Sequence, residues 1–142
     1  MMRISVFFIA LCLITVLFSC KQEKKESDGQ TRMQQVMAIH DEVMPKMGTL
    51  AKYTAELKAK VDTTEMGLQY EAAMKDLQNA NSAMMDWMMA FGERFDSEEI
   101  LNGKALTAQK LEWLNEEQEK VKVLQEQINS SIDRAQELRT ED

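Results

Sequence analysis

Apolar side chains recur in steps of three and four residues along three successive segments of the chain, which is the spacing of one face of an α-helix. The first segment carries Met33, Val36, Met37, His40, Val43, Met44, Met47, Leu50, Ala51, Leu57 and Val61 at this spacing. The second carries Met66, Tyr70, Ala73, Leu77, Ala80, Met84, Trp87, Met88, Phe91 and Phe95. The third carries Leu111, Leu114, Val121, Leu124, Ile128, Ile132, Ala135 and Leu138. The pattern predicts three long amphipathic helices.

Capping and turn residues separate the three segments. Asp62 and Glu65 have the spacing of a capping box, which predicts the start of the second helix. Asp96 gives a further helix start signal, and Gly103 after an asparagine gives a turn signal. Residues 96–106 are therefore expected to form a connection that contains one helical turn.

The short connections make neighbouring helices antiparallel, so the economical arrangement is an up-down-up three-helix bundle. We therefore expect an all-α domain over residues 33–142 with coiled-coil-like stripes. Pro45 lacks a backbone donor and crowds the carbonyl four residues earlier, which predicts a kink or break of the first helix near residues 41–44. A helical hairpin that completes its core in a homo-oligomer satisfies the same pattern.

Composition and charge exclude several classes of function. The 142 residues carry 17 Lys and Arg against 24 Asp and Glu, a formal net charge of −7, so a basic stripe for a nucleic-acid partner is not expected. Five glycines and one proline are too few for a turn-rich β-sandwich. One histidine, two cysteines and no glycine-rich phosphate loop leave no acid, base and nucleophile set, so we expect no enzyme.

The N-terminus carries an uncharged apolar run over residues 6–18 after Arg3. A membrane-spanning helix needs about 20 apolar residues, so this run is too short to span and is typical of a secretory signal. The motif Leu17-Phe18-Ser19-Cys20 follows it, with leucine three positions before the cysteine and a small residue just before it. This motif resembles the lipobox of bacterial lipoprotein precursors.

The lipobox resemblance implies that residues 1–19 are a signal peptide and that Cys20 is acylated. A protein acylated in this way is held at a membrane surface in the cell envelope without spanning the bilayer. Residues 21–32 contain no apolar side chain, so residues 20–32 are expected to be a lipidated cysteine and a disordered tether. The charged residues after Cys20 also resemble the export signals of Bacteroidota-type lipoproteins, which favours the outer membrane.

Three further segments carry a second resemblance, namely residues 40–48 (HDEVMPKMG), 84–88 (MMDWM) and 91–96 (FGERFD). They look like a group of small, uncharacterised Bacteroidota-type lipoproteins, some of which carry the automatic label "viral A-type inclusion protein". The label reflects helical, coiled-coil-like composition. The resemblance implies a lipid-anchored helical protein and assigns no activity and no site residues.

Methionines form two clusters, one on each of the first two predicted helices. If the hairpin turns near residues 61–63, Met37 is expected to face Trp87 and His40 to face Met84, at the end of the bundle nearest the lipid anchor. Thioethers with an imidazole suit soft metals such as Cu(I) or Ag(I), which gives a candidate metal set. The set comprises Met37, His40, Met44, Met84 and Met88. Methionine is also an ordinary gap-filling core residue, so the same side chains could be core alone.

Met85 and Met89 lie on the flank of the second apolar stripe rather than at its centre. A helix that is apolar around most of its circumference is buried on several sides or meets a partner. With Trp87 and Trp113, which should reach the same level, they form a candidate interaction surface for an unidentified envelope protein. The alternative is that the third helix covers both methionines. The sequence favours a non-enzymatic, lipid-anchored module that binds or spaces envelope components, with soft-metal binding as the alternative.

Overall fold

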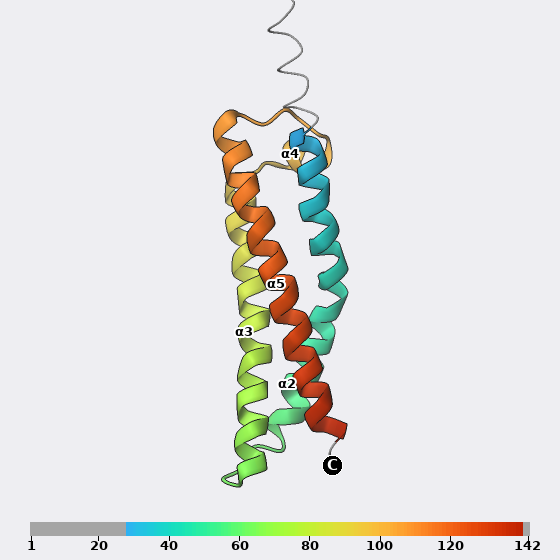
Figure 1. Ribbon diagram of the computed structural model, residues 1–142, viewed down its shortest axis with the longest axis vertical. Helices are drawn as coiled ribbons and strands as arrows, with labels where there is room; N and C mark the ends of the chain where they lie inside the picture. The colour runs from blue at the N-terminus through green and yellow to red at the C-terminus, as the bar shows by residue number, and fades with distance from the viewer. Residues whose placement is uncertain (1–27, 141–142) are drawn as a thin grey trace, which may run out of the picture.

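The computed structural model describes residues 28–140, which are helical apart from short connections and contain no strand (Figure 1). Residues 28–43 form the first helical segment, followed by η1 (Met44–Lys46), α2 (Met47–Lys58), α3 (Glu65–Arg94), α4 (Ser97–Leu101) and α5 (Ala108–Thr140). The all-α prediction is confirmed. Within this described part, no helix combines the length and apolar character needed to cross a membrane.

The long helices lie side by side and share one apolar core. Helix α3 packs against both α2 and α5, and α2 also contacts α5. Side chains from each apolar stripe are fully buried, for example Leu50, Leu77 and Ile128. Figure 1 shows residue 28 at the same end of the molecule as α4, with Thr140 and the α2–α3 connection at the other end.

The first helical segment is interrupted at Pro45. Met44–Lys46 forms a 3-10 turn with the proline in its first positions, because proline cannot donate the backbone hydrogen bond that an α-helix requires there. The α-helical pattern resumes at Met47. This 3-10 turn begins at the last residue of the predicted range 41–44, and a kink of the helix axis there stays a prediction.

The helix begins earlier than predicted, because residues 28–32 are helical although the sequence assigned them to the tether. Gly29 is buried, and a Cβ atom there would lie 2.8 Å from Cδ2 of Leu111. Gln30 donates a hydrogen bond from Nε2 to the carbonyl oxygen of Gly103, at 2.9 Å. The last part of the predicted tether is thus packed, while the signal peptide, Cys20 and the rest of the tether lie outside the described residues.

The sequence predicts the capping residues of α4 correctly and those of α3 incorrectly. At the start of α3 the N-cap is Thr64, whose hydroxyl accepts from the amide of Gly67, so the predicted capping box of Asp62 and Glu65 is wrong. Instead, Oδ1 of Asp62 accepts a hydrogen bond from the backbone amide of Thr64 at 2.9 Å, which forms a turn before the helix. At α4 the signal from Asp96 is confirmed, because its side chain forms a complete capping box.

Candidate functional site

The two methionine clusters meet in the core, but not in the predicted register. Met84 is fully buried, and the half-buried Met37, Met44 and Met88 pack against the same core. The ring of His40, which the sequence placed opposite Met84, lies beside Trp87, with centroids 6.0 Å apart. The first turn of α3 extends beyond the end of α2 (Figure 1), so the two helices are offset at their connection.

The candidate metal set occupies ordinary core positions around that contact. The Nδ1 atom of His40 lies 2.9 Å from Oδ1 of Asp41, so one ring nitrogen already has a partner. Within residues 28–140 no group of three or more His, Cys, Asp or Glu side chains could hold a metal ion. Any soft-metal site here would depend on the thioethers, which remains a prediction.

The exposed methionines are not covered by the third long helix. Met85 is 49% exposed and Met89 is 64% exposed, so the alternative that α5 buries them is wrong. They lie four residues apart on one face of α3, which places them one turn from each other. Together they form an apolar surface that we call the methionine pair.

The two tryptophans do not share the exposed surface of the methionine pair. Trp87 is 6% exposed and stacks on Phe91, with centroids 4.9 Å apart. Trp113 is half-buried, and the guanidinium of Arg94 lies over its ring at 5.3 Å from the centroid. Of the four residues predicted to form the interaction surface, the two methionines are exposed, whereas the two tryptophans are buried or half-buried.

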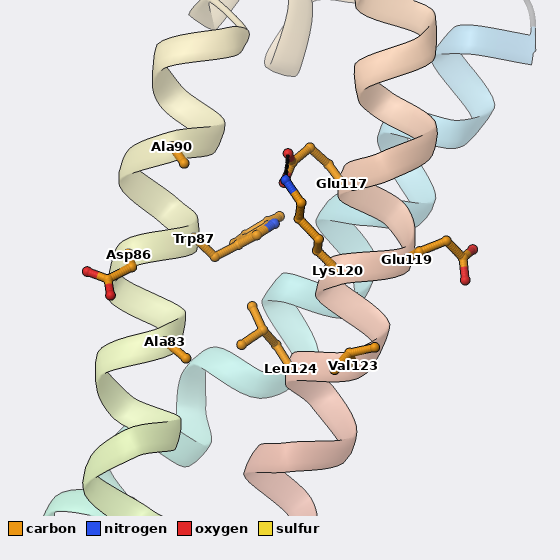
Figure 2. A pocket seen from close by; sticks show the side chains of 9 residues that line it. All are labelled: Ala83, Asp86, Trp87, Ala90, Glu117, Glu119, Lys120, Val123 and Leu124. Atoms are coloured by element: carbon orange, nitrogen blue, oxygen red, sulfur yellow. Dashed lines mark hydrogen bonds and ion pairs between the residues drawn. The ribbon is translucent and has the colours of Figure 1, made fainter.

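A groove between α3 and α5 was not predicted from the sequence. It is open to solvent, has a volume of about 530 Å³, and its surface is mostly apolar. Its lining residues are Ala83, Asp86, Trp87, Ala90, Glu117, Glu119, Lys120, Val123 and Leu124 (Figure 2). In Figure 2 the indole of Trp87 projects from α3 towards α5, while Asp86 and Glu119 point away from the groove.

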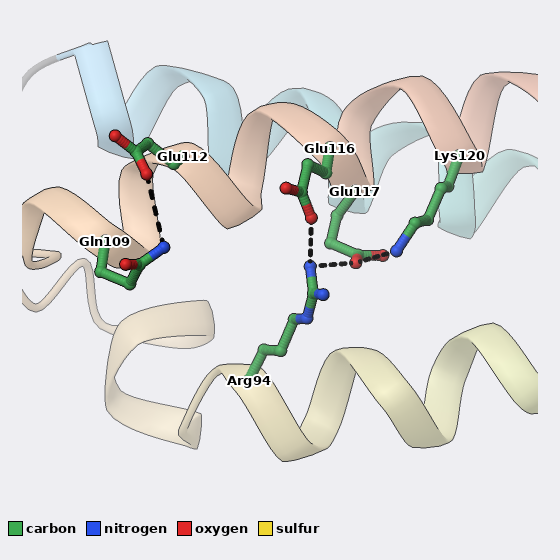
Figure 3. A network of polar contacts seen from close by, with 6 residues as sticks. All are labelled: Arg94, Gln109, Glu112, Glu116, Glu117 and Lys120. Carbon is green, nitrogen blue, oxygen red and sulfur yellow. Dashed lines mark hydrogen bonds and ion pairs between the residues drawn. The ribbon is translucent and has the colours of Figure 1, made fainter.

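An ion cluster lies beside the groove and joins α3 to α5 (Figure 3). Arg94, the last residue of α3, donates from Nη1 to Glu116 Oε2 at 2.8 Å and to Glu117 Oε1 at 2.9 Å. Lys120 Nζ also donates to Glu117 Oε1, at 2.8 Å. One carboxylate oxygen of Glu117 therefore accepts hydrogen bonds from two positively charged side chains.

Glu117 is fully buried, although its neighbour Glu116 is exposed. Neighbouring helical residues point about 100° apart, so Glu116 remains exposed while Glu117 faces α3. The position of Glu117, three residues after Leu114 and four before Val121, could have shown that it belongs to the apolar stripe.

Two buried polar atoms at the groove have no hydrogen-bond partner. Among the described side chains these are Nε1 of Trp87, a donor, and Oε2 of Glu117, an acceptor. Both residues line the groove. Buried polar groups in proteins are nearly always hydrogen-bonded, so this unpaired donor and acceptor are an unusual feature of the groove.

Comparison of the chain with protein-family models, with curated proteins and with solved structures finds no match. Function must therefore be inferred from the residues themselves. Two features stand out from an ordinary helical core, namely the exposed methionine pair and the groove with its unpaired donor and acceptor.

Proposed function

We propose that this protein is a lipid-anchored, non-enzymatic module of the cell envelope that binds or spaces envelope partners through the methionine pair. The observation that carries the proposal is the exposure of Met85 and Met89 on one face of α3. Large apolar side chains grouped on a surface are typical of sites where another molecule docks.

The chemistry of methionine supports a contact role. The thioether side chain is flexible and polarizable, so it adapts to apolar partners of different shape. Met85 and Met89 lie in the half of α3 that leads to α4, and residue 28 lies at that same end (Figure 1). A lipid on Cys20 would therefore hold the methionine pair near the membrane surface.

The proposed architecture is the up-down-up three-helix bundle, with a kink of the first segment at Pro45 and α3 between its two partners. The packing of α3 against α2 and α5 supports this arrangement. In such a bundle the outer face of α3 stays available to a partner. A homo-oligomer through that face is one form that the partner could take.

Replacing both residues of the pair tests the contact surface. We expect Met85→Gln/Met89→Gln in the full-length chain to lose partner capture when intact membranes are chemically crosslinked. Leu68→Gln is the matched control, because Leu68 is also an exposed apolar side chain of α3, at 56%. All substituted side chains are exposed, so the thermal midpoint should stay within a few degrees of the wild type. Capture that equals the wild type in the double variant contradicts the proposal.

The anchor is tested separately from the contact surface. Mass spectrometry of the cellular protein should show an acylated Cys20 as the new N-terminus. Cys20→Ala should leave the membrane fraction, while Cys12→Ala should not, because Cys12 belongs to the predicted signal peptide. Equal membrane fractionation of both variants would refute lipid anchoring. Separation of inner and outer membranes then tests the outer-membrane location.

The alternative function is soft-metal binding. It is supported by the meeting of the two methionine clusters and by His40 beside Trp87. Anaerobic titration of wild type with Cu(I) or Ag(I) should show a stoichiometric site if this alternative holds. Met37→Leu/Met84→Leu/Met88→Leu should then abolish the site, whereas Met66→Leu/Met74→Leu should keep it. No affinity in the wild type removes the alternative.

A further inference from the structure

We propose that the groove between α3 and α5 binds a neutral amphiphile, which is a small molecule with a hydrocarbon body and a hydroxyl head. The hydroxyl would accept the hydrogen bond of Trp87 Nε1 and donate to Glu117 Oε2. This site lies on different residues from the methionine pair and does not depend on a lipid at Cys20.

The size and lining of the groove suit a small molecule. Its volume of about 530 Å³ lies within the range of ligand pockets in proteins. Ala83 and Ala90 are seven residues apart on α3, so these two small side chains leave the space open, and Leu124 forms part of the opposite wall. Val123 contributes a side chain that is mostly exposed. This surface favours a hydrocarbon chain.

The unpaired atoms specify the head group. Trp87 is nearly buried and its nitrogen can only donate, whereas the buried carboxylate of Glu117 accepts. In Figure 2 the indole nitrogen lies at the end of the ring that faces α5, from which Glu117 projects. A hydroxyl group has one donor hydrogen and two acceptor lone pairs, so it carries both of the functions that the two atoms lack.

The charges around the groove select a neutral head. Asp86 and Glu119 carry negative charge beside the groove but point away from it, and Glu117 already pairs with Arg94 and Lys120. A fatty-acid carboxylate would meet the buried Glu117 and would be repelled. A cationic head would pair with Glu117 Oε2 but cannot accept the hydrogen bond of Trp87, so it would leave that buried donor unpaired.

1-Decanol is the probe for the full-length protein, used below its solubility limit. In the Trp113→Phe variant Trp87 is the remaining tryptophan of the chain, which has two. Saturable addition of 1-decanol should shift the emission of this variant. Calorimetric titration of the wild type should give one site per chain.

Matched variants separate hydrogen bonding from general hydrophobicity. Trp87→Phe keeps an aromatic ring and removes the donor, so affinity should fall about tenfold, the worth of one hydrogen bond. Trp113→Phe is its control and should keep the wild-type affinity. Ala90→Leu should fill the groove and abolish binding, whereas Ala72→Leu, on an exposed position of α3, should not.

Probe variants test the role of Glu117 without changing the protein. Methyl nonyl ether can accept from Trp87 but cannot donate to Glu117, so it should bind about tenfold more weakly than 1-decanol. Decanoate should bind still more weakly. Glu117→Gln should remove the difference between alcohol and ether, while Glu116→Gln, which also loses a contact with Arg94, should preserve it.

Three results would overturn the proposal. The first is no saturable binding of 1-decanol, in which case water alone meets the two buried atoms. The second is equal binding of alcohol, ether and decanoate, which would reduce the groove to an apolar surface. The third is a concentration-dependent dimer that Ala90→Leu disrupts and 1-decanol does not affect, which would make a second copy of the chain the occupant.

Discussion

The guanidinium of Arg139 lies over the ring of Tyr53, 4.1 Å from the centroid, and its Nε atom is 2.6 Å from Oε2 of Glu56. Arg139 lies in the last turn of α5, and both partners lie on α2. One side chain therefore joins the C-terminal end of α5 to α2 through a cation–π contact and an ion pair.

We expect Arg139→Gln to lower the free energy of unfolding by about 1 kcal/mol, because a partly exposed cation–π contact and ion pair are lost together. Lys122→Gln is the control, since Lys122 pairs with Glu119 of the same helix on an exposed surface. Urea denaturation of both variants measures the difference. Equal stability of the two variants would show that the Arg139 contacts contribute nothing measurable.

Glycine-to-alanine substitutions should change stability in opposite directions along the chain. A Cβ at Gly67 would lie 2.6 Å from the backbone nitrogen of Asp62, so Gly67→Ala should destabilise the protein by about 1–3 kcal/mol. At Gly48 and Gly92 a Cβ would meet nothing within 4 Å. Alanine there should stabilise the helices by about 0.5–1 kcal/mol each. Thermal unfolding gives all three values, and a stabilised Gly67→Ala would contradict the close contact.

Stability should decrease at acid pH through Asp96. A hydrogen bond from Lys104 holds the pKa of Asp96 below its usual value of 3.8. Because the folded pKa lies below the unfolded one, this contribution is complete above pH 3.8 and is lost as the pH falls through the folded pKa. Asp96→Asn keeps a capping oxygen but does not titrate, so its stability should fall less steeply below about pH 4.

The pKa of Asp62 is also lowered, by the hydroxyl of Thr64, so part of the acid slope should remain in Asp96→Asn. Asp62→Asn supplies the matched comparison. The pKa of Lys104 is raised by Asp96, so its contribution is complete below its usual value of 10.5 and is lost at higher pH. Identical acid slopes for the wild type and Asp96→Asn would contradict this assignment.

The buried carboxylate of Glu117 predicts a coupled pair of substitutions. Arg94→Met removes one of its two cations, which should cost about 2 kcal/mol because the buried charge is then less compensated. Arg94→Met/Glu117→Leu removes the charge as well and should recover most of that loss. A double-mutant cycle measured by chemical denaturation tests the coupling. Additive effects of the single changes would mean that the two side chains act independently.

The sequence predicted the elements whose causes are local. The three- and four-residue spacing was sufficient for an all-α fold, and Asp96 with Gly103 placed α4 and its turn correctly. Pro45 lies in a 3-10 turn, as its missing backbone donor requires. These features depend on backbone donors, caps and positive φ angles, which individual residue types reveal.

The errors have tertiary causes. Residues 28–32 are polar, and their helix depends on Gly29 lying close to Leu111. His40 lies beside Trp87 because the register between the first helical segment and α3 differs from the one expected for a hairpin that turns near residues 61–63. The groove forms where the small Ala83 and Ala90 of α3 face α5. It depends on two helices, so the apolar pattern of one helix alone does not predict it. Such features follow from the register between helices.

The first helical segment begins at one end of the molecule and α5 ends at the other (Figure 1), so the two ends of the described chain are separated by the length of the bundle. Helix α3, which runs between the two ends, has 30 residues and spans about 45 Å. A fluorophore attached after Thr140 should therefore sit at a fixed height above a labelled bilayer if the chain is tethered through its other end. Energy transfer from that position would report the tilt of the rod on the membrane.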